Sequence, residues 1–129
     1  SSTSGVKGYA GYAGSGGGYA TAKAGVLSLT RSMANSLASE SIRVNAIVPT
    51  AVNTMMATNK QMTAWITEDP DRAKHMANAL PVGMVEPIDT SNAIAFLVSD
   101  TGRYITGVEL PGFSEPRLNL LSGLVDSTL

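Results

Sequence analysis

The order of the predicted elements along the chain indicates an α/β fold, in which helices pack against a sheet. Residues 19–40 are predicted to form a long helix, because apolar side chains recur at helical spacing and proline is absent. A short, largely apolar strand over 42–48 follows, and Pro49 ends it because proline has no N–H for a ladder. A second helix, opened by Glu86, and a final strand over 103–110 repeat this order. The alternation of helix and strand therefore predicts layers of helix on sheet.

The first long helix is predicted to present an apolar face and to follow a glycine-rich loop over residues 5–18. The apolar positions of that face are Val26, Leu29, Met33 and Leu37. A phosphate-binding turn is not predicted, because residues 14–19 lack the closing glycine of G-x-G-x-x-G and no apolar strand precedes them. Gly16 to Gly18 are interpreted as loop residues that permit positive φ, and Tyr9 and Tyr12 as exposed loop aromatics.

The segment from Met55 to Leu80 is predicted to form short helices that break near Asp69 and Pro70. Its methionines and Trp65 suit an apolar substrate lid, and they suit an ordinary hydrophobic core equally well. The single histidine, His75, lies in a polar stretch and the chain has no cysteine, so no metal site is predicted. His75 is interpreted as a surface residue.

The second helix has a clear start signal, with proline in its first turn and Asp89 placed favourably for the helix dipole. Its inward residues are predicted to be Ile94, Leu97 and Val98. It is predicted to end near residues 100–102. After Pro111 the regular pattern fades, so residues 112–129 are left as an unassigned tail.

Composition excludes several classes of protein. A chain of 129 residues with 43% hydrophobic and 15% charged residues is typical of one globular domain. The formal charge of −1 gives no electrostatic reason to expect nucleic acid or an anionic membrane as partner. The absence of cysteine excludes disulfides and fits the reducing cytoplasm, and no apolar run has the ~20 residues of a membrane span. The chain begins at Ser1 rather than at methionine, which suggests a piece of a longer protein.

The chemistry of the chain is centred on Tyr19 and Lys23, which one turn of helix places on the same face. A phenol titrates near 10 in model peptides, and a nearby cation stabilises the phenolate. Such a pair can exchange a proton near neutral pH. The same spacing is also common on solvated helix faces, so the pair alone is weak evidence.

Several motifs in order resemble the short-chain dehydrogenase/reductase family over most of residues 1–111. They are Ser1-Ser2-Thr3-Ser4-Gly5, Tyr19-Ala20-Thr21-Ala22-Lys23-Ala24-Gly25-Val26, Ile42-Arg43-Val44-Asn45 and Pro49 through Thr54. A closer resemblance is to the mycofactocin-coupled, carveol-dehydrogenase-like branch of this family. It depends on Ala79-Leu80-Pro81-Val82, Val85-Glu86-Pro87, Ser91-Asn92-Ala93 and Arg103-Tyr104-Ile105-Thr106-Gly107-Val108.

The resemblance implies a site for hydride transfer between a small apolar alcohol or ketone and NAD, with NADP left open. Tyr19 would exchange a proton with the substrate oxygen, and Lys23 would stabilise its phenolate and hold the nicotinamide ribose. Ser2 would polarise the substrate oxygen, with Ser4 as the alternative serine. The residues implied to border the nicotinamide are Pro49, Thr50, Val52 and Thr54, with the Val52 backbone and the Thr54 hydroxyl toward the carboxamide.

The resemblance also implies that residues 1–111 are the C-terminal half of a Rossmann-type, doubly wound parallel sheet with three αβα layers. The family's N-terminal glycine-rich turn for the pyrophosphate has no counterpart in the chain. Two hypotheses follow. The chain is the catalytic half of a dehydrogenase that is a homotetramer or homodimer when intact, or it is a truncated product without activity. Residues 19–40 and 105–110 resemble the family elements that pack between subunits.

Overall fold

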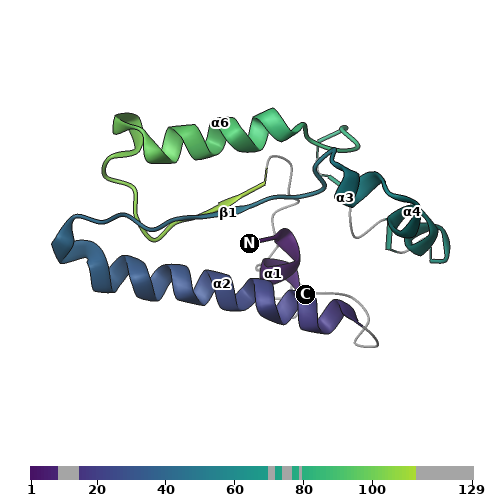
Figure 1. The fold of residues 1–129 in the computed structure, drawn as a ribbon, viewed down its shortest axis with the longest axis horizontal. Coiled ribbons are helices and arrows are strands. Elements are labelled where there is room, and N and C mark those ends of the chain that lie inside the picture. Colours follow the sequence, from purple (N-terminus) through teal and green to yellow (C-terminus); the bar gives the residue numbers. More distant parts are fainter. Residues whose placement is uncertain (9–14, 70–71, 74–76, 79, 113–129) are drawn as a thin grey trace, which may run out of the picture.

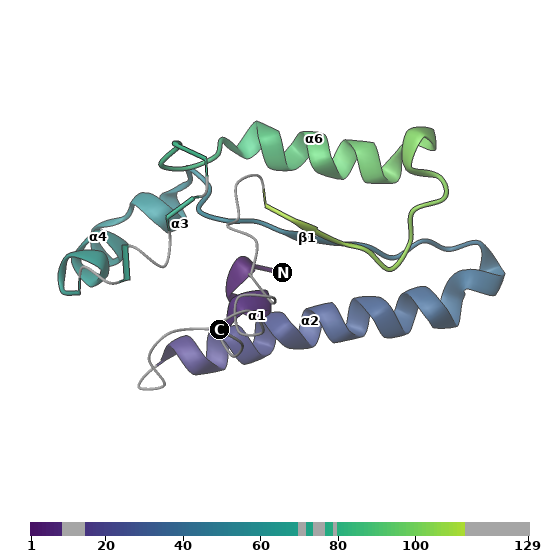
Figure 2. The same ribbon diagram turned by 180° about the vertical axis from the view of Figure 1, so that it is seen from behind.

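The structure is a computed structural model that describes residues 1–8, 15–69, 72–73, 77–78 and 80–112. Figure 1 shows a short parallel sheet, β1 (Ala46–Val48) and β2 (Glu109–Pro111), between the helices α2 (Ser15–Leu37) and α6 (Pro87–Val98). Figure 2 shows the same order of layers from behind. Because α2 and α6 both contact β1, helices cover both faces of the sheet. The predicted α/β class with three αβα layers is confirmed.

Helices occupy much of the segment that was predicted to be a glycine-rich loop. The short helix α1 (Thr3–Lys7) begins with Ser2 as its cap, whose Oγ accepts a hydrogen bond from the Ser4 N–H at 3.2 Å. Because α2 begins at Ser15, residues 16–18 are helical, and the prediction of a loop there is wrong. Glycine in a helix costs up to about 1 kcal/mol relative to alanine. We attribute the tolerance of that cost to the packing of α2 against α1 and β1.

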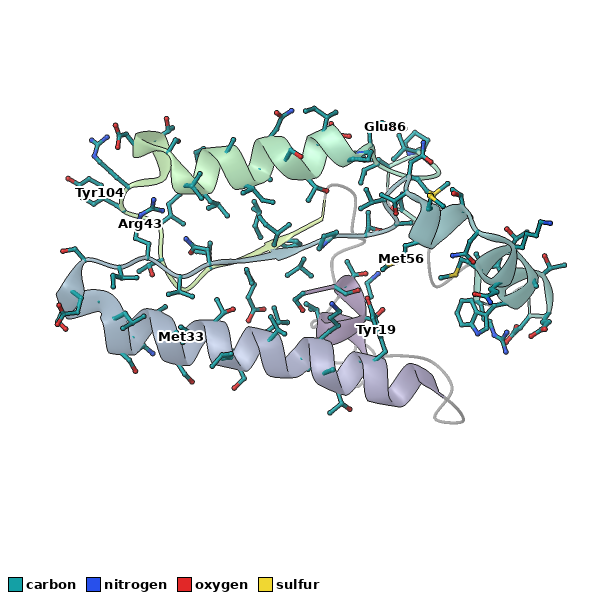
Figure 3. All side chains as sticks on the ribbon, viewed as in Figure 1. Tyr19, Met33, Arg43, Met56, Glu86 and Tyr104 are labelled. Carbon is teal, nitrogen blue, oxygen red and sulfur yellow. The ribbon has the colours of Figure 1, made fainter. Side chains whose placement is uncertain are left out.

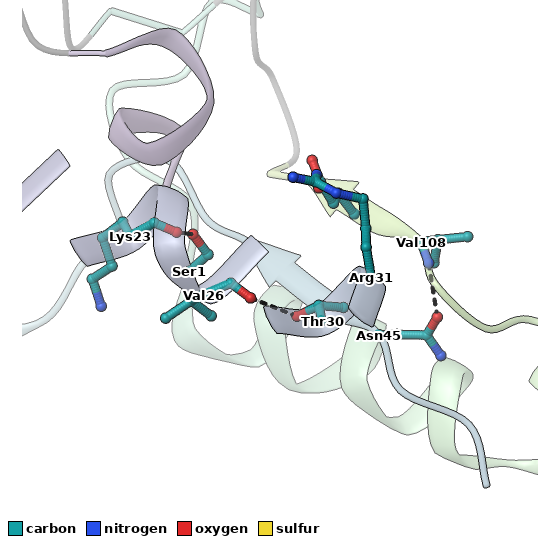
Figure 4. Close-up of polar contacts among 8 residues, drawn as sticks. Ser1, Lys23, Val26, Thr30, Arg31, Asn45 and Val108 are labelled. Carbon is teal, nitrogen blue, oxygen red and sulfur yellow. Dashed lines mark hydrogen bonds and ion pairs between the residues drawn. The ribbon is translucent and has the colours of Figure 1, made fainter. Parts of the chain in front are cut away.

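The buried face of α2 is not the apolar face that the sequence predicts. Its buried residues are Ala20, Leu27, Thr30 and Ala34. The predicted apolar face stays open within this chain, because Val26, Leu29 and Met33 are 43%, 57% and 40% exposed. Small side chains on the sheet-facing side let the helix backbone approach β1 closely. Thr30 is tolerated there because its hydroxyl donates to the Val26 carbonyl at 2.9 Å, as Figure 4 shows.

The two strands pair in parallel register, with Ala46 opposite Glu109 and Val48 opposite Pro111. Both are shorter than predicted, because before Ala46 the backbone bond from the Gly107 N–H to the Val44 carbonyl is accompanied by side-chain bonds instead of a regular ladder. The amide of Asn45 accepts from the Val108 N–H at 3.1 Å and donates to the Ile105 carbonyl at 2.9 Å. Leu27, Ala46 and Val48 form the buried cluster between α2 and the sheet.

Helix α6 begins where the sequence predicts. Pro87 occupies its first turn, and the Asp89 carboxylate accepts a hydrogen bond from the Glu86 N–H at 2.9 Å. Of the three residues predicted to face inward, Leu97 is buried. Ile94 and Val98 are 46% and 70% exposed, so their assignment is wrong. The core position beside Leu97 on this helix is taken by Ala93, which the periodicity did not single out.

Two short helices, α3 (Met55–Thr58) and α4 (Lys60–Thr67), extend beyond the carboxyl end of β1. Asn59 separates them, and its Oδ1 accepts from the Met62 N–H at 2.8 Å to begin α4. The predicted break near residues 69–70 agrees with the end of α4. Among the described residues, no helix combines the length and apolarity of a membrane span. The predictions for Tyr9, Tyr12, His75 and residues 113–129 fall outside the described residues.

Candidate active site

Tyr19 and Lys23 lie one turn apart on α2 and approach each other closely. The Lys23 Nζ lies 5.4 Å from the centroid of the Tyr19 ring. Tyr19 is 44% exposed and projects from α2 beside α1, as Figure 3 shows. The ammonium thus lies within cation–π distance of the tyrosine ring, while part of the side chain stays open to solvent. The structure thus brings together the two side chains that the spacing predicted to share a face.

Helix α1 carries Ser2 and Ser4 to the same part of α2 through a close backbone contact. A Cβ atom on Gly5 would lie 2.7 Å from the Lys23 carbonyl carbon and 2.9 Å from the Ala24 nitrogen. Only glycine therefore lets α1 pack this closely on α2. The Ser1 Oγ donates to the Lys23 carbonyl at 2.7 Å, which Figure 4 shows. Burial, and then the charge of Lys23, lower the pKa of the Ser1 amino group.

The loop after β1 holds the four residues predicted to border the nicotinamide. The Pro49 carbonyl accepts a hydrogen bond from the Thr3 N–H at 3.2 Å, which joins this loop to α1. A Cβ on Gly112 would lie 2.5 Å from the Thr50 nitrogen, and the Gly112 N–H donates to the Val48 carbonyl. Gly112 therefore packs directly against the backbone at the start of this loop. Gly112 belongs to the tail over residues 112–129 for which the sequence predicts no structure.

Val52 and Thr54 lie on the second half of this loop. Val52 forms a parallel bridge with Val85, in which Val85 bonds to the residues on either side of Val52. The Val85 N–H donates to the Ala51 carbonyl at 3.0 Å, and the Val85 carbonyl accepts from the Asn53 N–H at 2.8 Å. In such a bridge the N–H and C=O of Val52 itself point away from Val85. The Thr54 hydroxyl lies 3.4 Å from the Val52 carbonyl. Together they present backbone and hydroxyl groups on the side of the loop away from the bridge.

The remaining loop residue, Thr50, donates its hydroxyl hydrogen to Asn78 Oδ1 at 2.7 Å. Asn78 was not predicted as a site residue. A single polar side chain within the apolar run around Ala77 and Leu80 was the signal that could have found it.

A cavity of about 500 Å³ lies next to the loop, between it and α4. The described residues that line it are apolar apart from one amide, and they are Ala51, Ala57, Ile66, Ala73, Ala77, Asn78, Leu80, Pro81, Val82, Gly83 and Met84. Two of the methionines predicted for a lid or core, Met55 and Met56, are 87% and 76% exposed. Trp65 stacks with Arg72, whose guanidinium carbon lies 4.7 Å from the ring centroid. The core interpretation is therefore wrong for Met55 and Met56, and the lid interpretation stays a prediction.

Comparison with known proteins identifies the family. A family model described as enoyl-(acyl carrier protein) reductase matches residues 1–111. An uncharacterized oxidoreductase of Mycobacterium tuberculosis is 48% identical over 95 residues, which cover 73% of this chain and 35% of that protein. The (-)-trans-carveol dehydrogenase of Rhodococcus erythropolis is 44% identical over 119 residues, which cover 86% of this chain and 42% of that enzyme.

Among solved structures, carveol dehydrogenase from Mycobacterium avium in complex with NAD superposes with a TM-score of 0.75 and 41% identity. The superposition covers 86% of this chain and 42% of that one, and it confirms the Rossmann-type fold. The chain thus spans 35% to 42% of the length of these three proteins. The named relatives also confirm the predicted likeness to carveol dehydrogenases. The chain belongs to the short-chain dehydrogenase/reductase family.

Proposed function

We propose that this chain is the catalytic part of an NAD-dependent oxidoreductase that interconverts a small apolar secondary alcohol and its ketone. The observation that carries the proposal is the Lys23 ammonium at 5.4 Å from the Tyr19 ring, beside the loop that follows β1. Ligands of open α/β sheets bind at the carboxyl ends of the strands, which is where this loop lies.

In the proposed oxidation, Tyr19 as phenolate would take the alcohol O–H proton, and bound NAD would supply the acceptor for the hydride that leaves the carbinol carbon. The products are the ketone, the reduced nicotinamide and a neutral Tyr19, which returns its proton to solvent. Lys23 stabilises the phenolate and holds the nicotinamide ribose. The Ser2 Oγ accepts a backbone hydrogen bond from Ser4, so its own hydrogen is available to the substrate oxygen.

The loop residues Pro49, Thr50, Val52 and Thr54 border the nicotinamide in this proposal. The Thr54 hydroxyl donates its hydrogen to the Val52 carbonyl, so the outward Val52 N–H and the oxygen of the Thr54 hydroxyl are the donor and the acceptor that suit a carboxamide. The carveol dehydrogenases to which the chain is similar, one of them in complex with NAD, support NAD as the cofactor and a carveol-like alcohol as the substrate. The apolar lining of the cavity supports the same class of substrate. A cytoplasmic location and coupling to mycofactocin stay predictions.

The test is a chimera in which the nucleotide-binding half of Mycobacterium avium carveol dehydrogenase precedes Ser1. We expect NAD-dependent oxidation of (-)-trans-carveol, followed as NADH absorbance. Tyr19→Phe should lower kcat by about 10² to 10⁴-fold while the Kd for NAD stays nearly unchanged, because only the transferable proton is lost. Lys23→Met should lower kcat and also weaken NAD binding. The matched control is Tyr104→Phe, whose ring is 88% exposed on another part of the surface.

Normal turnover by the Tyr19→Phe chimera would contradict the assignment of Tyr19. The alternative hypothesis, an inactive truncated product, applies to the 129-residue chain alone. For that chain we expect NAD binding no tighter than about millimolar, because a few hydrogen bonds of ~1 kcal/mol each oppose several kcal/mol of lost ligand freedom. Calorimetric titration decides this, and a low micromolar Kd would show that the chain holds the whole cofactor site.

The proposal includes a homodimer or homotetramer of the longer protein. Val26, Leu29 and Met33 form an exposed apolar stripe along α2, which would be buried by a second copy. Met33→Glu in the chimera should lower the sedimentation coefficient at micromolar concentration, and Asn35→Asp on the same helix serves as the control. A parent chimera that sediments as a monomer would remove this part of the proposal.

A further inference from the structure

The side chain of Asn78 joins two parts of the candidate site that are distant in the sequence. Its Oδ1 accepts the Thr50 hydroxyl at 2.7 Å. Its Nδ2 donates to the carbonyls of Val82 and Gly83 at 2.9 and 3.1 Å. Thr50 belongs to the loop proposed to border the nicotinamide, whereas Val82 and Gly83 are in the wall of the cavity. One half-buried amide thus connects the proposed cofactor loop with the cavity wall.

The orientation of this amide is set by its partners. A carbonyl oxygen can only accept a hydrogen bond, so the amide nitrogen must face Val82 and Gly83. The amide oxygen then faces Thr50, and the Thr50 hydroxyl has to be the donor. Its hydrogen is therefore committed to Asn78, and only its lone pairs are left for a ligand. Asn78 controls in this way both the place of Thr50 and the direction of its hydroxyl.

A second connection lies next to the first. The bridge of Val52 with Val85 joins the same loop to the residues that follow the cavity wall. Asn53 extends it, because its Nδ2 lies 3.1 Å from a carboxylate oxygen of Glu86. The loop and the wall are thus held together at two points, one through backbone groups and one through the Asn78 amide. A displacement of the wall is transmitted to the loop as long as both connections exist.

We propose that Asn78 is a positioning residue that couples filling of the cavity to binding of the nicotinamide through Thr50. The coupling rests on the proposed function, because it needs a cofactor at the loop and an apolar molecule in the cavity. Asn78 is suited to this role because it is the polar side chain among the described lining residues, and both its amide oxygen and its amide nitrogen are held by partners within the protein. It therefore does not bind the substrate but holds the two surfaces that do.

The structural part of the proposal is tested in the 129-residue chain by amide hydrogen exchange. The N–H groups of Val85 and Asn53 form the bridge and report its opening. In Asn78→Ala we expect both to exchange about five- to tenfold faster, which is the effect of one lost hydrogen-bond connection. Ala46, whose N–H donates to the Val108 carbonyl at 2.9 Å, should not change. The control is Asn92→Ala, an exposed asparagine on α6. Unchanged exchange of Val85 and Asn53 in Asn78→Ala would overturn the proposal.

The coupling is measured in the chimera with NADH and (-)-trans-carveol as probes. Both are reduced, so they form a ternary complex without reaction. In the parent we expect saturating carveol to lower the Kd for NADH at least about fivefold. The coupling is the ratio of the NADH Kd without carveol to the NADH Kd with saturating carveol. Asn78→Ala should bring this ratio close to one. Asn78→Asp should do the same, because it retains the acceptor for Thr50 but loses the donors to Val82 and Gly83. Thr50→Ser keeps the hydroxyl and should keep the ratio.

These outcomes separate the coupling from a general structural effect. A merely structural role would weaken NADH binding in Asn78→Ala but leave the ratio as in the parent, and that result would overturn the proposal. A parent ratio of one would overturn it as well. A parent chimera that binds no NADH contradicts the proposed function instead, while the exchange experiment still decides whether Asn78 holds the loop to the wall.

Discussion

The two ends of β1 are both rich in polar groups, but they use them differently. At the amino end, the Arg43 guanidinium donates to the carbonyls of Leu97, Gly102 and Ile105, the last two at 3.0 and 3.4 Å. These bonds satisfy carbonyl groups at the end of α6 and around the 3₁₀-helix η2 (Asp100–Gly102). At the carboxyl end, Tyr19 lies half-exposed and the backbone of Val52 points away from its bridge.

The difference shows which end of a sheet supports function. Polar groups that satisfy one another, as around Arg43, have little capacity left for a ligand, whereas polar groups held in place by other contacts keep theirs. The cavities at the two ends of β1 show the same difference. The hollow at the amino end, about 330 Å³, is lined in part by Arg43 and Asn45, whose polar groups are engaged. The cavity at the carboxyl end adjoins the loop on which the backbone of Val52 points away from its bridge.

The strongest test of this comparison is Gly5→Ala at the carboxyl end. The added methyl group would lie within 2.9 Å of the Lys23 backbone, so α1 must move away from α2. We expect a loss of about 3 kcal/mol in the free energy of unfolding, measured in urea, and a loss of turnover in the chimera. Gly25→Ala is the matched control. Nothing lies within 4 Å of its Cβ position, so it should stabilise α2 by up to about 1 kcal/mol.

A smaller effect is expected for Arg43→Met at the amino end. Methionine fills similar space but leaves carbonyls at the end of α6 without their donor, which should cost about 2 kcal/mol of unfolding free energy. Turnover per folded chimera should stay as in the parent. Arg103→Met is the control, because that side chain is exposed. If Arg43→Met lowered kcat without lowering stability, it would be wrong to assign a structural role to the amino end of β1 and a functional role to its carboxyl end.

The smallest effect is expected at the ion pair of Arg31 with Glu109, which joins α2 to β2 and whose side chains are 56% and 26% exposed. Surface pairs of this kind contribute about 0 to 1 kcal/mol. A double-mutant cycle with Arg31→Met and Glu109→Gln should give a coupling energy in that range. The coupling should decrease further at 1 M salt, because screening acts on exposed charges. A coupling above about 2 kcal/mol would give this pair a structural importance equal to that of Arg43.

Much of the fold could be predicted because its signals are local. Helical periodicity and the absence of proline identified α2, and Pro87 with Asp89 identified the start of α6. The spacing of Tyr19 and Lys23 was sufficient to place them on one face, since a helix fixes the relation of residues one turn apart. The family likeness rested on the same short motifs, and the comparisons confirmed it.

The sequence by itself therefore determined most of α2 and the start of α6, which two side chains meet on α2 and which family the chain belongs to. Only the tertiary structure decided which side of α2 is buried, because Ala20 and Ala34 are selected by the close approach of the sheet and not by their own hydrophobicity. It also decided the contact of Gly5 with α2 and that of Asn78 with Thr50. Contacts between residues this far apart in the chain depend on how the layers pack, which no local pattern encodes.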